Sequence, residues 1–263
     1  MFSVNTAQID AWIVVYAFPL VRILAFIASA PLWSTAGIPR RMRLILGIAI
    51  TLAIAPALPA MPQVAPGSLA GLWILAQQIL IGVGMGFSAR VVFAAIDMAG
   101  EFIGMQMGLG FATSYDPMSA SQTPVISEFL TMLGFLFFLS INGHLMYIAT
   151  LAQSFYAIPV SITLPLSSGS WLNIAELGSK IFSAGLLISL PIIVALMITN
   201  VGLAVLTRAA PQLNIFALGF PLTLGGGFIA IAISMSYLAT PFQALYEYAL
   251  SALLGFSVLA PTQ

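Results

Sequence analysis

The stretch LAGLWILAQQILIGVGMGFSARVVFAAI, residues 69–96, decides the fold class of this chain. It holds a single charged residue, Arg90, and is longer than the ~20 apolar residues that cross a bilayer core of about 30 Å. Lipid offers no partner to backbone amides, and the period-two alternation of a membrane β-barrel is missing from this stretch. It therefore predicts a membrane-spanning α-helix.

The rest of the chain has a similar composition. Of its 263 residues, 61% are hydrophobic and 5% are charged, whereas soluble domains carry roughly 25% charged residues. Seven basic and seven acidic residues cannot cover a soluble fold, and their zero net charge does not favour nucleic-acid binding. The absence of cysteine excludes disulfides and thiolate metal sites. We expect the surface to be covered by membrane lipid or by partner subunits.

Six apolar windows predict an all-α polytopic membrane protein with about six long, partly kinked helices. Pro19, Pro191 and Pro241 fall inside windows and are expected to kink their helices. Turn-forming residues at 56–67 and 159–170 predict loops. The windows are 11–33, 42–58, 69–96, 127–151, 177–206 and 228–259.

A stretch rich in proline and glycine, residues 208–227, interrupts the apolar C-terminal part. Pro211, Pro221 and the consecutive glycines 225–227 favour a short turn or a re-entrant element. Broken helices at membrane depth are tolerated only where protein buries them or where they line a cavity. The C-terminal part is therefore expected to be a broken helical hairpin without a seventh span.

Three glycines that follow the opening stretch, Gly100, Gly104 and Gly108, are spaced by four residues. On a continuous helix they lie on one face and form a smooth groove where another backbone can approach closely. The sequence leaves open whether this helix-packing groove receives another part of the chain or another subunit.

Ionisable residues are rare here and are therefore informative. Arg90, Asp97 and Glu101 are seven and four residues apart, within about 40° of one helical face. Charges at membrane depth suggest function by default, and with broken helices they suggest a secondary transporter. In the alternative interpretation, Arg90, Asp97 and Glu101 form a structural ladder of arginine and acidic residues. Together with Arg208 they are then interface charges. Arg22 lies in the middle of the first window, and its partner cannot be named from sequence.

Residues 105–118 form an apolar segment that is unsuited to a helix. Gly108, Gly110 and Pro117 discourage helix formation there. An apolar loop can close a pore by excluding water, and it can equally be buried filler. The apolar residues at its start are Met105, Met107, Leu109 and Phe111.

The sequence contains no recognisable catalytic site. His144 stands alone, with no second histidine and no cysteine, and a zinc or haem site needs more ligands. A Gly-x-Ser-x-Gly elbow and a phosphate-binding P-loop are missing as well. We expect neither enzyme activity nor a metal or cofactor.

Three blocks carry a family resemblance: GMQMGLGFA at 104–112 followed by Asp116-Pro117, NGH at 142–144, and RAAPQLNIFALGFPL at 208–222. Through them the chain resembles the FliR/SctT family of type III secretion export-gate proteins, over nearly its whole length. The resemblance implies a gate formed with FliP and FliQ, with FlhB and FlhA nearby, in the bacterial inner membrane at the flagellar basal body. The gate would pass unfolded flagellar export substrates, with energy supplied from elsewhere.

The resemblance also implies two parts. It implies that residues 1–163 form a FliP-like part and that residues 164–263 form a FliQ-like helical hairpin. In the family, the loop after the glycine-rich helix plugs the closed pore, and here it maps to residues 105–118. The plug residues so implied are Met105, Met107, Gly108, Leu109, Gly110, Phe111, Asp116 and Pro117.

Overall fold

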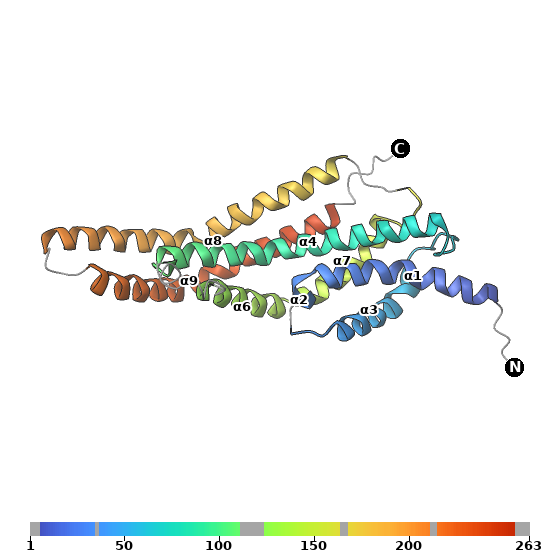
Figure 1. The fold of residues 1–263 in the computed structure, drawn as a ribbon, viewed down its shortest axis with the longest axis horizontal. Coiled ribbons are helices and arrows are strands. Elements are labelled where there is room, and N and C mark those ends of the chain that lie inside the picture. Colours follow the sequence, from blue (N-terminus) through green and yellow to red (C-terminus); the bar gives the residue numbers. More distant parts are fainter. Residues whose placement is uncertain (1–5, 35–36, 111–123, 164–167, 211–214, 256–263) are drawn as a thin grey trace. The chain divides into compact units, whose positions relative to one another are not determined.

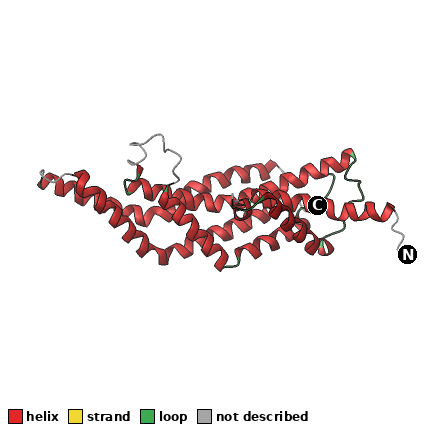
Figure 2. Ribbon diagram, turned by 60° about the horizontal axis from the view of Figure 1, so that its bottom comes forward, coloured by secondary structure: helices red, strands yellow, loops and turns green. Residues whose placement is uncertain are grey.

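The computed structural model describes the chain except for residues 1–5, 35–36, 111–123, 164–167, 211–214 and 256–263. The described residues are mostly helical, and none of them forms a strand (Figure 2). The predicted fold class, an all-α polytopic membrane protein, is confirmed. The elements are α1 (Thr6–Ser29), α2 (Pro31–Ser34), α3 (Arg40–Ile54), η1 (Ala55–Ala57), α4 (Leu69–Gln106), α6 (Val125–Ser140), α7 (Gly143–Ala157), α8 (Ser168–Ala209) and α9 (Ile215–Gly255) (Figure 1).

Among the described residues, the candidate spans are fewer than the six windows suggested. Within the described ranges, four helices are long and apolar enough to cross a membrane: α1, α4, α8 and α9. A fifth crossing results if the bent pair α6 and α7 is one broken span. Its bend lies at Asn142, whose φ of 56° is left-handed, a conformation that asparagine tolerates well. α3 has 15 residues, so it is about 22 Å long and shorter than the bilayer core.

The C-terminal hairpin is less broken than expected. α8 runs to Ala209 and α9 begins at Ile215, so Pro221 and glycines 225–227 lie inside a helix. The prediction of a turn or re-entrant element at these residues is wrong. The preferences of proline and glycine are measured in water, whereas in apolar surroundings a helix break leaves backbone groups without partners. Pro211 lies outside the described residues.

The other prolines behave in the same way. Pro19 lies inside α1, Pro191 inside α8 and Pro241 inside α9, and each helix continues on both sides of its proline. Membrane helices tolerate proline because neighbouring groups satisfy the freed carbonyl. The kinks expected at these positions stay predictions.

Residue contacts divide the chain into two compact units. Unit 1 comprises Met1–Val91, Asn142–Leu177 and Glu247–Gln263, and unit 2 comprises Val92–Ile141 and Gly178–Tyr246. α4, α8 and α9 each contribute residues to both. The predicted boundary near residue 163 divides the chain by resemblance and not by contact, so it stays a prediction.

Within unit 1, α1 packs on α3 and α4 at glycines. α1 and α3 lie side by side (Figure 1), and a Cβ on Gly47 of α3 would overlap the Leu24 side chain. On α4, a Cβ on Gly82 would overlap the main-chain oxygen of Arg22, and Gly86, four residues later, is equally close to α1. Small residues let membrane helices approach closely, and α1 packs directly against Gly82 and Gly86.

An apolar cluster also fills the interior of unit 1. It joins α1, the predicted proline-rich loop after η1, and α4. Its buried members are Val14, Phe18, Met61 and Ile74. The partly buried residues packed against them are Leu58, Val64, Leu75 and Val160.

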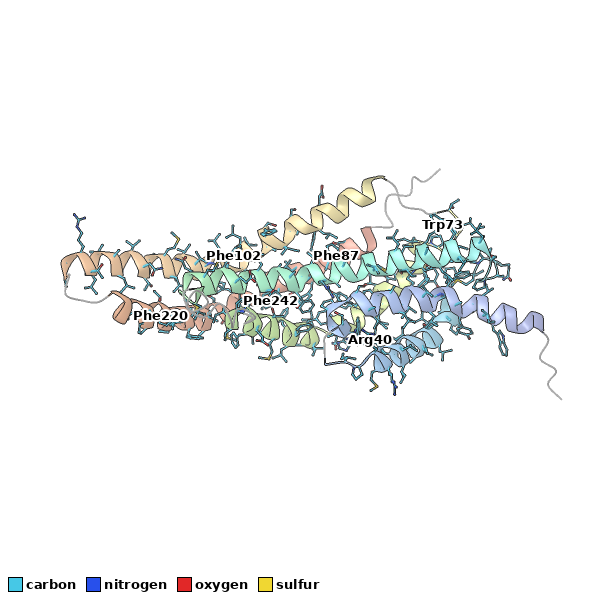
Figure 3. The ribbon with its side chains drawn as sticks, in the orientation of Figure 1. Arg40, Trp73, Phe87, Phe102, Phe220 and Phe242 are labelled. Atoms are coloured by element: carbon cyan, nitrogen blue, oxygen red, sulfur yellow. The ribbon has the colours of Figure 1, made fainter. Side chains whose placement is uncertain are left out.

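Within unit 2, aromatic side chains join α4, α6 and α9. Tyr246 lies among them, and its hydroxyl donates a 2.8 Å hydrogen bond to the carbonyl oxygen of Gly134. Phe242, labelled in Figure 3, lies one turn earlier on α9 and contacts the Phe137 ring. We call these side chains the aromatic cluster: Phe93, Phe135, Phe137, Phe138, Phe242 and Tyr246.

Candidate functional site

A glycine ends α4. The helix runs to Gln106, and Gly108 has a φ of 86°, in the left-handed region. The Gly108 N–H donates to the Met105 carbonyl at 3.0 Å. The Leu109 N–H donates to the Gly104 carbonyl at 3.1 Å. Together these bonds form a Schellman motif, in which a residue without a Cβ best occupies the left-handed position. The chain therefore leaves α4 at one of the glycines that were predicted to stop it.

Met107 anchors this turn inside unit 2. Its side chain is 0% exposed, and the Thr223 hydroxyl of α9 donates to its carbonyl oxygen at 3.1 Å. A Cβ on Gly227, one turn further along α9, would come within 2.6 Å of the Met107 Cγ and Cε atoms. Sequence reasoning missed both contacts. Gly227 was noted in the sequence, but only as one of three consecutive glycines that were interpreted together as a helix break.

The other predicted plug residues are described only in part. Met105 is 60% exposed, Leu109 is half-buried and Gly110 is exposed. Met105 is the penultimate residue of α4, so the prediction that the loop begins at residue 105 is wrong, and the first residue after the helix is the buried Met107. The plug residues outside the described ranges are Phe111, Asp116 and Pro117.

The predicted glycine groove does not continue to Gly108, because α4 ends before it. At Gly100, a Cβ would overlap the main chain of Ser127 in the first turn of α6. At Gly104, a Cβ would make an ordinary contact, 3.9 Å from the Ile126 Cβ. The described part of the groove thus receives α6 of the same chain, and its use by another subunit stays a prediction.

The predicted interface charges make separate contacts. Arg90 donates to Ser34 Oγ at 3.2 Å, and Asp97 accepts a hydrogen bond from the first-turn serine hydroxyl of α6. Glu101 is half-buried. Arg208 is exposed in the last turn of α8, where a cation interacts favourably with the helix dipole. Among the described residues, the side-chain hydrogen bonds of Arg90 and Asp97 join them to hydroxyl groups, and the use of these charges in a secondary transporter stays a prediction.

Arg22 is a cation buried in the middle of α1, and the structure identifies its partners. Its side chain is 0% exposed, and its Nε donates to Gln78 Oε1 of α4 at 2.7 Å. One terminal nitrogen lies 3.0 Å from the Ser154 carbonyl oxygen and 3.2 Å from its hydroxyl. The other donates to the Ile158 carbonyl at 2.9 Å. The guanidinium carbon lies 4.1 Å from the centroid of the Phe155 ring, a cation–π distance.

These contacts make Arg22 a cap for the C-terminal end of α7. A helix end leaves its last carbonyls without partners and carries a partial negative charge. Carbonyl dipoles and an aromatic face therefore offset the buried charge, in place of a carboxylate. Beside it, Gln77 donates to the Ile162 carbonyl at 3.0 Å and holds the segment after α7. We call this set the Arg22 junction: Arg22, Gln77, Gln78, Ser154, Phe155 and Ile158.

The sequence contained one signal for this junction. Gln77 and Gln78 are consecutive amides inside the apolar stretch that predicted the span. Buried amides need partners, so a pair of them indicates a polar contact across the helix. The identity of that partner required the fold, because Arg22 and Ser154 are 132 residues apart in sequence.

The surfaces of α8 and α9 leave most of their apolar residues uncovered by the chain itself. In their apolar windows, 28% and 22% of residues are buried, against 61% in α4. Lipid and other proteins must cover the remainder, because exposed apolar surface of this extent is not stable in water. The described residues also hold no group of three or more His, Cys, Asp and Glu side chains suited to a metal ion.

Comparison with known proteins gives a consistent result. Residues 13–249 match the family described as bacterial export proteins, family 1. The flagellar biosynthetic protein FliR of Escherichia coli K12 is 45% identical over 239 residues, which cover 91% of each chain. The FliR protein of Pectobacterium carotovorum is 44% identical over 89% of this chain and 88% of its own. That of Aquifex aeolicus is 32% identical over 81% and 82%.

These relatives are similar over nearly the whole chain and not in one motif only, and the resemblance seen in the sequence is confirmed. The apolar helices agree with a component of a membrane apparatus. The chain therefore belongs to the FliR family of flagellar biosynthetic proteins, and it is a membrane component of the flagellar export apparatus.

Proposed function

We propose that this chain is a core subunit of the flagellar protein export gate. With FliP and FliQ it forms the pore for unfolded substrate polypeptides in the bacterial inner membrane, near FlhB and FlhA. Family membership supports the place in the export apparatus. The uncovered apolar residues of α8 and α9 support assembly with other membrane subunits.

The anchored turn at the end of α4 is the observation that carries the gating proposal. A passive gate needs apolar side chains held at a fixed place, where they exclude water and ions. Met107 is held by α9, and the segment that leaves from there begins with Leu109 half-buried and Gly110 exposed. We propose that this segment closes the pore at rest and moves aside for a substrate.

The C-terminal hairpin supports the proposed division of the chain. α8 and α9 are two long helices, of which the first ends at Ala209 and the second begins at Ile215. A FliQ-like part from residue 164 and a FliP-like part before it agree with this order of elements. The secondary transporter that Arg90, Asp97 and Glu101 suggested has less support, because family membership favours protein export.

The gating proposal is tested by deleting residues 108–115 and measuring ion conductance in cells that make the complete gate. We expect a resting leak of ions, because the apolar seal is lost. The deleted chain must still co-purify with FliP and FliQ, which shows that the gate has assembled. Unchanged conductance in an assembled gate would contradict the seal, and failure of the intact chain to co-purify with these partners would contradict the assembly.

A further inference from the structure

Two residues on one face of α9 hold the end of α4. Thr223 and Gly227 are four residues apart and both are buried. The Thr223 hydroxyl lies 3.1 Å from the Met107 carbonyl oxygen and 3.1 Å from the Phe220 carbonyl of its own helix. Residues four apart lie on the same helical face, so the two positions act on Met107 together.

Gly227 differs from the two glycines before it. A Cβ on Gly227 would come within 2.6–2.7 Å of three Met107 side-chain atoms. A Cβ on Gly225 or Gly226 would meet nothing within 4 Å. Only the third glycine is therefore required by a neighbour, and that neighbour is the buried methionine.

The contact has a direct effect on where the chain leaves α4. Met107 immediately precedes Gly108, whose left-handed φ of 86° turns the chain away from the helix axis. Thr223 satisfies a carbonyl that the helix end leaves without an intrahelical partner. The unbranched, flexible methionine side chain fits over the bare backbone of Gly227. The turn is thereby fixed by main-chain and side-chain contacts at once.

We propose that Thr223 and Gly227 are positioning residues for the segment that follows α4. They hold Met107, and through it they set the position from which that segment starts. A displacement of α9 at Thr223 and Gly227 would be transmitted to the start of the segment. The proposed effect on conductance rests on the proposed gate function, whereas the positioning itself does not.

The first test uses the lack of native cysteine in this chain. Leu109→Cys introduces a single thiol next to the anchored turn, and a water-soluble maleimide on membranes reports its accessibility. In this background, Gly227→Ala should raise the labelling rate several-fold, because its Cβ displaces Met107. Gly226→Ala is the matched control, and it should leave the rate unchanged. Equal rates in the two variants would overturn the proposal.

A second variant pair keeps the test valid if Gly227→Ala does not accumulate in the membrane. Thr223→Val preserves shape and removes the hydroxyl donor, whereas Thr223→Ser preserves the donor. We expect faster labelling of Cys at position 109 with valine than with serine. Similar rates for the two would contradict the role of the hydroxyl.

A compensating variant separates the side-chain contact from a general weakening. Met107→Ala removes the Cγ, Sδ and Cε atoms that Gly227→Ala would meet. Adding Gly227→Ala to Met107→Ala should therefore change the labelling rate little, since the two changes share one contact. Fully additive effects of the two substitutions on the labelling rate would contradict the proposed contact between Met107 and Gly227.

Conductance then distinguishes the two proposals. Faster labelling with a leak supports both positioning and gating. Faster labelling with normal conductance supports positioning and contradicts the gate. A leak after deletion of residues 108–115, with labelling unaffected by Gly227→Ala, contradicts positioning alone.

Discussion

Unit 1 and unit 2 join their helices by different means. In unit 1, a buried guanidinium connects α1 to α4 and to the end of α7 through four hydrogen-bond contacts. In unit 2, stacked and edge-on rings connect α4, α6 and α9, and the hydroxyls of Tyr246, Ser127 and Thr223 add hydrogen bonds between these elements. Lipid is as apolar as a leucine side chain, so association of membrane helices needs either close packing or polar bonds. The two units rely on these two solutions to different degrees.

The difference has a consequence for how each unit responds to substitution. Removing a polar group leaves its partners unsatisfied in an apolar interior, and each such group costs roughly 1–3 kcal/mol. Removing part of a ring leaves a cavity whose cost depends on how far the neighbours relax. The stability of unit 1 should therefore depend on a few polar atoms, and that of unit 2 on the close packing of many ring atoms.

The largest effect is expected for Arg22→Met. Methionine fills a similar volume but leaves the oxygens of Gln78 and Ile158 without the Arg22 donor, while the Ser154 carbonyl keeps its 2.8 Å bond from the Ile158 N–H, so we expect a loss of about 3 kcal/mol. The measurement is thermal unfolding of the chain purified in detergent from cells with a complete export apparatus. The stability of Arg22→Lys should fall between that of the wild type and that of Arg22→Met, because an ammonium group has no planar fork to reach all three partners. Wild-type stability in Arg22→Met would show that the junction does not hold unit 1 together.

Gly82→Ala should have the next largest effect. The added methyl group overlaps the Arg22 main chain and must push α1 away from α4, at a cost of about 1–3 kcal/mol. Gly84→Ala is the control on the same helix, because its Cβ meets nothing within 4 Å. That change should be neutral or stabilising, since alanine favours helix over glycine. Equal melting temperatures for both variants would argue against the close approach of α1.

Tyr246→Phe should have a smaller effect in unit 2. The ring contacts remain, and only the 2.8 Å hydrogen bond to Gly134 is lost, which corresponds to roughly 1 kcal/mol. Thermal unfolding of the same preparation measures it. A loss as large as that of Arg22→Met would remove the distinction between a polar and an aromatic unit.

Ser34→Ala should have the smallest effect. It removes the hydroxyl that Arg90 contacts at 3.2 Å, but the bond is exposed, so we expect a change within about 0.5 kcal/mol. This variant shows whether burial, and not the presence of an arginine, makes a polar contact important. A melting temperature as low as that of Arg22→Met would refute that view.

The sequence predicted those features that depend on local composition. Long apolar runs predicted helices, and Gly108 predicted the end of α4, because a left-handed turn needs a residue without a Cβ. The partners of Arg22 and the contact of Met107 with α9 could not be predicted, because they join residues from 56 to more than 100 positions apart. The triple glycine was misinterpreted because its propensity in water does not describe a helix in apolar surroundings.

The lengths of α8 and α9 bear on the lifetime of a newly made chain. With 42 and 41 residues, each is about 60 Å long, roughly twice the bilayer core, and a tilt of about 40° does not bring it inside. A chain made without other export components would expose rows of apolar side chains on α8 and α9 to water. Chaperones and proteases act on such surfaces, so synthesis of this chain has to keep pace with that of its partners.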